Sequence, residues 1–240
     1  MFELTTDYPK AVASYDDEGL AAAIEWSAGK AEAGEVISVW TSLKSNLANS
    51  EVLDGFVRRY SDVTHVTGRG SSYLHSTGPV LMAWPDMDGI GELLRSAPRI
   101  RSLCVIAWND DEIRPWVTAT RPVILGDGSP WQTLDPPLDP VVVEALKDIT
   151  SSINHNNTIK AGYEKDDVVG TLLALKAARI PMDGKAMQGW ALAHGWSGGN
   201  PAQLATYVSD INAGRRPKTS RQFRSDYVAW LREKAAGAAE

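Results

Sequence analysis

The feature that most constrains the fold of this chain is a change of pattern near residue 126. Before it, five short apolar runs rich in β-branched residues alternate with stretches whose apolar residues recur at helical spacing. Because parallel strands need crossover connections, this alternation predicts an α/β fold, with an open, mostly parallel sheet of about five strands and crossover helices. The predicted strands lie at 36–40, 62–67, 79–84, 102–108 and 122–125.

After the change, every periodic stretch predicts a helix. A connector rich in Gly and Pro occupies 126–138, and Asp139 followed by Pro140 is a typical helix start. We therefore predict two domains, a Rossmann-like α/β domain over 1–130 without a nucleotide-binding fingerprint and an all-α helical bundle over 131–240. The predicted helices lie at 139–153, 163–179, 183–194, 200–213 and 221–235.

One connection in the predicted sheet has no helical pattern. A loop rich in Gly and Ser, 68–78, joins the second and third predicted strands, so this connection is either irregular or antiparallel. The loop follows a strand and carries Arg69 and His75. Its backbone amides and these two side chains could bind an anionic ligand. A surface loop that binds nothing is an equal alternative.

Composition and charge exclude several classes of protein. Hydrophobic residues make up 43% of the 240 residues, enough for a sizeable core. The sequence has no apolar run long enough to span a membrane and no secretory signal at its start, which predicts a cytoplasmic protein without a membrane partner. The single cysteine, Cys104, excludes an intrachain disulfide and a Cys-cluster zinc site.

Catalytic signatures are missing from the sequence. There is no G-x-x-x-x-G-K-[ST] phosphate loop, no G-x-G-x-x-G after a strand and no H-E-x-x-H zinc motif. The G-x-S-x-G at 195–199 follows a helical pattern instead of a strand, and no histidine comes after it. We therefore favour a protein that is not an enzyme, and we expect no cofactor.

Acidic residues follow two of the predicted strands and leave a second interpretation open. These acids are Asp86 and Asp88 after one strand, and Asp110 and Asp111 after the next. At the carboxyl ends of neighbouring strands, they could hold Mg²⁺ for phosphoryl transfer or phosphodiester cleavage. The simpler alternative is that acids cap the first turns of helices, which needs no ligand.

Tryptophan is frequent, with nine residues in the chain. Three of them, Trp40, Trp84 and Trp108, each lie at the end of a predicted strand. There they could stack on the ring or base of a ligand. Alternatively, large aromatic side chains plug the top of the sheet or pack against the second domain.

Charge is divided unevenly along the chain, whose net charge is −6. Residues 1–154 have a balance of −10, whereas residues 155–240 have a balance of +4. The segment 214–224 concentrates five cations without an acid, and such a segment can neutralise nucleic-acid phosphates. These cations could instead dock on the acidic first half or be solvated. The five cations are Arg215, Arg216, Lys218, Arg221 and Arg224.

These observations favour a non-catalytic or accessory intracellular protein. In this hypothesis the C-terminal helices bind nucleic acid, and the α/β domain is a platform for a ligand or a partner. The first alternative is a Mg²⁺-dependent enzyme that uses the strand-end carboxylates. The second is an interaction protein whose acidic and basic halves pair in a homo-oligomer or with a protein partner.

Overall fold

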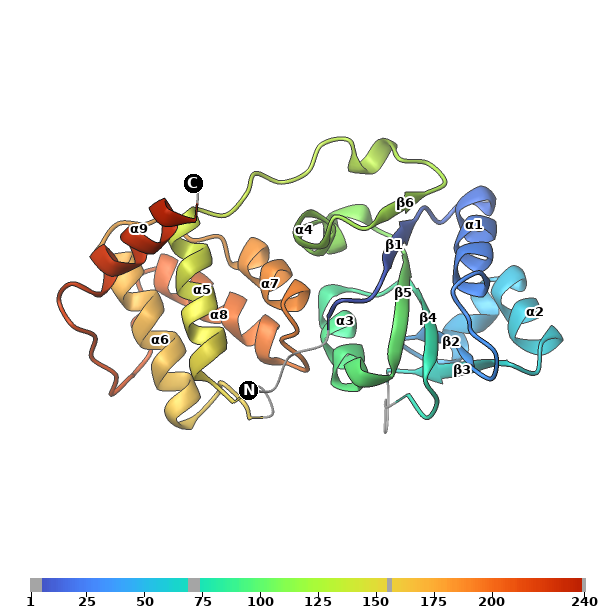
Figure 1. The fold of residues 1–240 in the computed structure, drawn as a ribbon, viewed down its shortest axis with the longest axis horizontal. Coiled ribbons are helices and arrows are strands. Elements are labelled where there is room, and N and C mark those ends of the chain that lie inside the picture. The colour runs from blue at the N-terminus through green and yellow to red at the C-terminus, as the bar shows by residue number, and fades with distance from the viewer. Residues whose placement is uncertain (1–5, 69–73, 155–156, 239–240) are drawn as a thin grey trace.

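The structure is a computed structural model that describes residues 6–68, 74–154 and 157–238. The described residues form six strands in one sheet, in the order β3-β2-β4-β5-β1-β6, and every adjacent pair is parallel (Figure 1). The strands are β1 (Lys10–Ala13), β2 (Ile37–Thr41), β3 (Val63–Thr67), β4 (Gly78–Ala83), β5 (Ile100–Ile106) and β6 (Val123–Leu125).

The predicted α/β class is confirmed. The sheet has six strands instead of about five, because the sequence pattern did not predict β1. This strand has only four residues, and two of them are alanines of low strand propensity. It nevertheless lies inside the sheet, where Ala11 is the partner of Cys104 on β5 and of Val123 on β6. Hydrogen bonding from both sides therefore stabilises a strand that its own residues do not favour.

The antiparallel alternative for the second and third predicted strands is wrong. These strands are β3 and β4, and both pair in parallel with β2, which lies between them. In this register Val39 of β2 is the partner of His65 on one side and of Leu81 on the other. The chain must therefore return to the amino edge of the sheet between Thr67 and Gly78.

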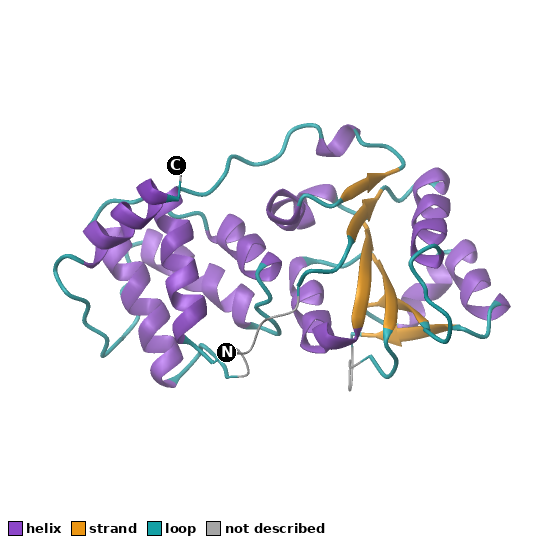
Figure 2. Ribbon diagram, viewed as in Figure 1, coloured by secondary structure: helices purple, strands orange, loops and turns teal. Residues whose placement is uncertain are grey.

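Helices cover both faces of the sheet (Figure 2). On one face, Leu20 of α1 and Leu53 of α2 belong to the same buried cluster as Val39 of the sheet. On the other face, Ile90 of α3 and Trp116 of α4 share a separate cluster with strand residues. The helices of this part are α1 (Asp17–Ala28), α2 (Glu51–Arg59), α3 (Met87–Leu93) and α4 (Asp110–Thr120), with 3-10 turns at Lys44–Asn49, Leu94–Arg99 and Ser129–Trp131.

Polar side chains begin these helices as local sequence rules predict. Ser50 Oγ accepts a hydrogen bond from the amide of Leu53, at 3.3 Å. Asp86 Oδ1 accepts one from the amide of Gly89 at 2.7 Å, and Asn109 caps α4 in the same way. Capping side chains therefore mark the starts of α2, α3 and α4.

The C-terminal helices enclose a hydrophobic core of their own, in which Leu146, Val168, Leu204 and Leu231 are fully buried. The predicted helical bundle is confirmed, while the domain boundary at residue 130 stays a prediction. Within the described residues, no helix is both long enough and apolar enough to cross a bilayer. The helices are α5 (Pro140–Ser152), α6 (Gly162–Ala177), α7 (Gly184–Ala193), α8 (Asn200–Asn212) and α9 (Tyr227–Gly237).

The helical part packs against the sheet part through α7, which lies on α4 (Figure 1). Gly189 of α7 sits so close to Pro115 of α4 that a Cβ atom there would lie 2.4 Å from two backbone atoms. Leu192 of α7 is buried in the cluster of the sheet part. Gln188 Nε2 donates a 3.0 Å hydrogen bond to Asp88 Oδ1 across the junction. Close backbone approach, apolar burial and a polar contact thus hold the two parts together.

Candidate functional site

The basic segment, residues 214–224, connects α8 to α9 at the end of the molecule away from the sheet (Figure 1). This position argues against the alternative that its cations dock on the acidic first half. Three of the five cations form ion pairs, all with acids of the C-terminal helical part. The pairs are Arg215 with Asp210 at 2.6 Å, Arg221 with Asp167 at 3.2 Å and Arg224 with Asp226 at 3.2 Å.

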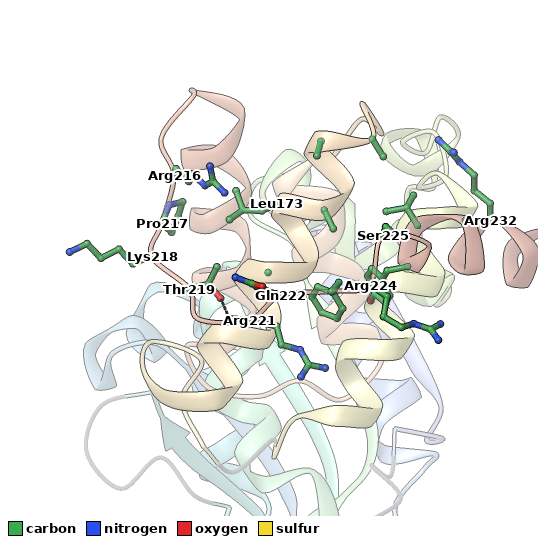
Figure 3. A pocket seen from close by; sticks show the side chains of 18 residues that line it. Leu173, Arg216, Pro217, Lys218, Thr219, Arg221, Gln222, Arg224, Ser225 and Arg232 are labelled. Carbon is green, nitrogen blue, oxygen red and sulfur yellow. Dashed lines mark hydrogen bonds between the residues drawn. The ribbon is translucent and has the colours of Figure 1, made fainter.

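A groove of about 860 Å³ lies between the basic segment and helices α6 and α9 (Figure 3). Its apolar wall includes Leu173 of α6, Phe223 of the basic segment and Val228 of α9. Of the lining residues that the structure describes, none is acidic. Five cations line this basic groove, namely Arg216, Lys218, Arg221, Arg224 and Arg232.

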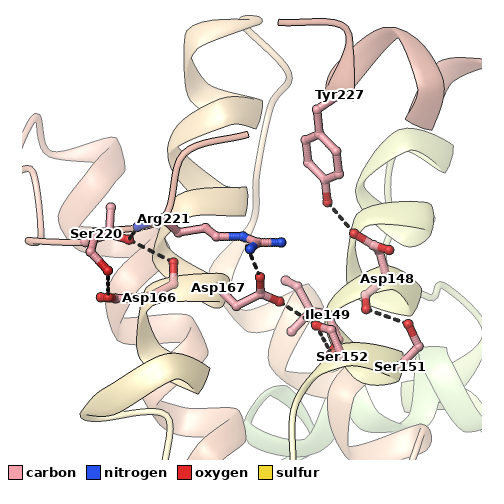
Figure 4. A network of polar contacts seen from close by, with 10 residues as sticks. Asp148, Ile149, Ser151, Ser152, Asp166, Asp167, Ser220, Arg221 and Tyr227 are labelled. Atoms are coloured by element: carbon pink, nitrogen blue, oxygen red, sulfur yellow. Dashed lines mark hydrogen bonds and ion pairs between the residues drawn. The ribbon is translucent and has the colours of Figure 1, made fainter. Parts of the chain in front are cut away.

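Acids of α6 hold the basic segment in an extended course (Figure 4). Thr219 Oγ1 donates to the backbone oxygen of Asp166 at 2.8 Å, and the Ser220 hydroxyl donates to the carboxylate of the same residue. The Asp167 carboxylate is only 4% exposed and pairs with the Arg221 guanidinium. These contacts use residues 219–221 for anchoring, which explains why α9 begins at Tyr227 and not at the predicted residue 221.

The cations of the groove therefore have different roles. Arg221 anchors the segment, whereas Arg216, Lys218 and Arg232 are exposed and pair with no acid among the described residues. In Figure 3, Lys218 and Arg232 lie at opposite ends of the groove. Arg232 lies outside the predicted basic segment. It follows the groove residue Val228 by four positions on α9 and so shares its helix face.

The predicted metal ligands lie at the carboxyl ends of β4 and β5, which are neighbours as the Mg²⁺ hypothesis requires. Their side chains have other contacts. Asp86 caps α3, Asp88 accepts the hydrogen bond from Gln188, and Asp111 pairs with Arg114 at 3.0 Å. Across the described part of the chain, no group of three or more His, Cys, Asp or Glu side chains is placed to hold a metal ion. Asp110 lies partly buried at the start of α4.

The three tryptophans predicted to stack on a ligand differ in exposure. Trp40 is only 2% exposed and fills the core of one sheet face, so it does not face a ligand. Trp84 directly follows β4 and is partly buried, and Trp108 follows β5 and is 67% exposed. Both contact the ring of Tyr15, with ring centroids 5.5 Å apart for Trp84 and 4.6 Å apart for Trp108. The structure thus brings together two of the three.

The predicted anion-binding loop, 68–78, is described only in part. Arg69 lies outside the described residues. His75 is exposed and precedes β4, at the amino edge of the sheet, whereas the tryptophans and acids lie at the carboxyl edge. His75 therefore does not join the other predicted ligand-binding residues.

Comparison with known proteins gives a match in the C-terminal helical part. A family model described as a domain of unknown function (DUF1889) matches residues 138–232. This span contains helices α5 to α8, the basic segment and the part of α9 that carries Arg232. No curated protein and no solved structure matches the chain.

Proposed function

We propose that the protein binds nucleic acid through the basic groove of its C-terminal helices, while the α/β part is a platform for a ligand or partner. The observation that supports this proposal best is a set of exposed cations, Arg216, Lys218 and Arg232, that form no ion pair with the residues the structure describes. They surround a groove in which no described lining residue is acidic. Cations in this state are available to phosphates, because no ion pair has to break first.

The distribution of charge supports a local interface. A chain of net charge −6 repels nucleic acid as a whole, so binding requires a region where cations are concentrated. The basic segment that lines the groove lies at the end of the molecule away from the acidic sheet part (Figure 1). Salt screens charges over about 10 Å at 0.1 M, so distant acids weaken the attraction little.

Aromatic packing beside the cations favours a flexible strand over a rigid duplex. Phe223 lines the basic groove, stacks on Tyr227 with centroids 4.1 Å apart and lies 4.9 Å from the Arg221 guanidinium. Single-stranded nucleic acid is typically bound by cations that follow the backbone and by aromatic rings that meet bases. We therefore expect single strands to bind more tightly than duplex of equal length.

The test is fluorescence anisotropy with labelled single-stranded and duplex oligonucleotides over a salt series. Three phosphate contacts give a slope of log K against log salt of about −2 to −3, a loss of about 20- to 60-fold between ~50 and ~200 mM salt. The variant R216E/K218E/R232E removes the three unpaired cations without breaking an ion pair of the fold. It should abolish binding at ~50 mM salt.

The matched control is K30E/K44E/R59E, which changes the net charge equally on exposed positions of the sheet part. These three residues form no ion pair with the residues that the structure describes. The control should bind nearly as well as the wild type. Equal losses in both variants would mean that only net charge matters, and a wild-type protein that binds neither oligonucleotide at ~50 mM salt refutes the proposal.

A further inference from the structure

The chain reverses its direction of crossing at the carboxyl edge of the sheet, between β5 and β1. These strands are neighbours, but β1 leads to α1 on one face of the sheet and β5 leads to α4 on the other. In open α/β sheets, ligands bind where connections from adjacent strands diverge in this way. The topology therefore makes the residues that follow β1 and β5 one of two such positions, the other lying between β2 and β4.

Three aromatic side chains gather at this position. Tyr15 follows β1, Trp84 follows the neighbouring β4, and Trp108 follows β5. We call these residues the aromatic platform. Tyr15 lies between the other two, with its ring at 80° to Trp84 and at 56° to Trp108. Trp84 holds a left-handed backbone with φ of 55°, which is unusual for a bulky residue. Trp108 remains the most exposed, so a ring face is available to a ligand.

The surroundings of the aromatic platform are acidic. Asp16 follows Tyr15, Asp110 begins α4, and the amide of Asp127 donates to Ser14 Oγ at the end of β1. Burial raises the pKa of Asp110, and the negative charges of Asp111 and Asp127 add to the effect while Arg114 opposes it.

Arg114 offsets only part of the negative charge of Asp16, Asp110, Asp111 and Asp127 at this edge of the sheet. Its guanidinium pairs with Asp111 and donates to the backbone oxygens of Pro130 and Thr133, at 2.7 and 3.0 Å. The remaining carboxylates repel phosphates and other anions, which are the usual ligands at this place in α/β folds.

We propose that the aromatic platform binds a small organic cation, an ammonium group carried on an apolar body. The platform lies at the carboxyl edge of the sheet, where α/β folds bind ligands. The nearby carboxylates favour a positively charged ligand, and the aromatic faces attract a cation that is weakly hydrated. A metal ion fits less well, because the acids near the platform form no metal-holding group among the residues that the structure describes. This inference is independent of the nucleic-acid proposal, since the basic groove lies on the other part of the chain.

The experiment follows the indole N–H resonance of Trp108 by NMR during titration with choline, assigned with W108L. The matched probe is 3,3-dimethylbutan-1-ol, which has the same shape without the charge. Choline should shift the resonance, and the neutral alcohol should not. In Asp110→Asn the affinity should fall about fourfold, as expected for unit charges about 5 Å apart in water. Tyr60→Leu removes an exposed aromatic ring between α2 and β3, at the amino edge of the sheet and not at the carboxyl edge, and should change nothing.

A short lysine-containing peptide is titrated in parallel. Its affinity relative to that of choline shows whether the platform prefers a free ammonium compound or the ammonium group of a peptide side chain. Equal shifts with choline and the neutral alcohol would reduce the platform to an apolar patch and overturn the proposal. Equal shifts with choline and MgCl₂ at matched ionic strength would also overturn it. Oligonucleotide binding by W108L should equal that of the wild type. A platform that binds no cation therefore leaves the nucleic-acid proposal unaffected, and a groove that binds no oligonucleotide leaves the cation proposal unaffected.

Discussion

Replacing Gly189 by alanine tests the junction between the sheet part and the helices that carry the basic groove. The added Cβ atom would lie 2.4 Å from the backbone carbon and oxygen of Pro115, whereas ordinary contacts of this kind are 3.4–4 Å. Helix α7 must therefore move away from α4 by about 1 Å, because backbone atoms cannot turn aside as a flexible side chain can.

The magnitude follows from two opposing effects. Overpacking of this kind costs about 1 to 3 kcal/mol. Alanine regains about 1 kcal/mol of helix propensity relative to glycine. Since the clash is with backbone on the α4 side, we place the cost near its upper range and expect a net loss of about 1 to 2 kcal/mol. For a chain of this size, that lowers the melting temperature by about 2 to 8 °C.

The control is the same substitution at Gly55, in the interior of α2. A Cβ atom there would meet nothing within 4 Å, so alanine should stabilise the protein by about 0.5 to 1 kcal/mol. Thermal unfolding measures both variants, and hydrogen exchange should show Gly189→Ala losing protection in α4 and α7 first. A Gly189→Ala protein as stable as the wild type would show that α7 does not pack on α4 this closely.

Two further predictions concern charge. Arg221→Met leaves the Asp167 carboxylate buried beside the Ser152 hydroxyl without its cation. We expect urea denaturation to show a loss of about 1 to 3 kcal/mol, below the value for a fully buried pair because Arg221 is 41% exposed. Arg215→Met breaks a more exposed pair and should cost below about 0.5 kcal/mol, so equal losses would contradict the anchoring role. The backbone hydrogen bond at the start of α1 lowers the pKa of Asp16, so its contribution to stability is present above about pH 4 and is lost as the pH falls through the lower folded pKa. In an acid titration followed by circular dichroism, Asp16→Asn should therefore differ from the wild type at neutral pH and match it at the acid end.

Local rules predicted the elements that depend on local interactions. Ser50 and Asp183 begin helices α2 and α7 as capping rules expect of such residues, because each capping hydrogen bond spans only three residues. The apolar runs predicted five strands correctly, and three of them, β2, β4 and β5, are buried along almost their whole length, as strands covered on both faces are. Strand order was not predictable, because a strand buried on both faces has the same composition at any internal position of a parallel sheet.

Tertiary contacts decided the remaining features. The sequence 221–226 has helical periodicity but forms no helix: residues 221–224 have no regular secondary structure and 225–226 form a turn. Residues 219–221 are held by Asp166 and Asp167 of α6, which lie more than fifty positions away in the chain. Trp40 and Trp108 look alike as strand-end tryptophans, yet one is buried and the other exposed. That difference depends on how the neighbouring strands and helices cover each side of the sheet. The sequence of one β-strand does not contain this information.

The junction also explains why opposite charges within one chain stay apart. The acidic sheet part and the basic segment lie at opposite ends of the molecule, and the backbone contact between Gly189 and Pro115 fixes that separation. Neutralisation inside one molecule would require α7 to leave α4, which would expose Leu192 and break the bond from Gln188 to Asp88. A rigid separation of this kind costs the protein favourable Coulomb energy at low salt. It leaves the unpaired cations of the basic groove and the carboxylates of the sheet edge accessible to partners outside the chain, each selecting the opposite charge.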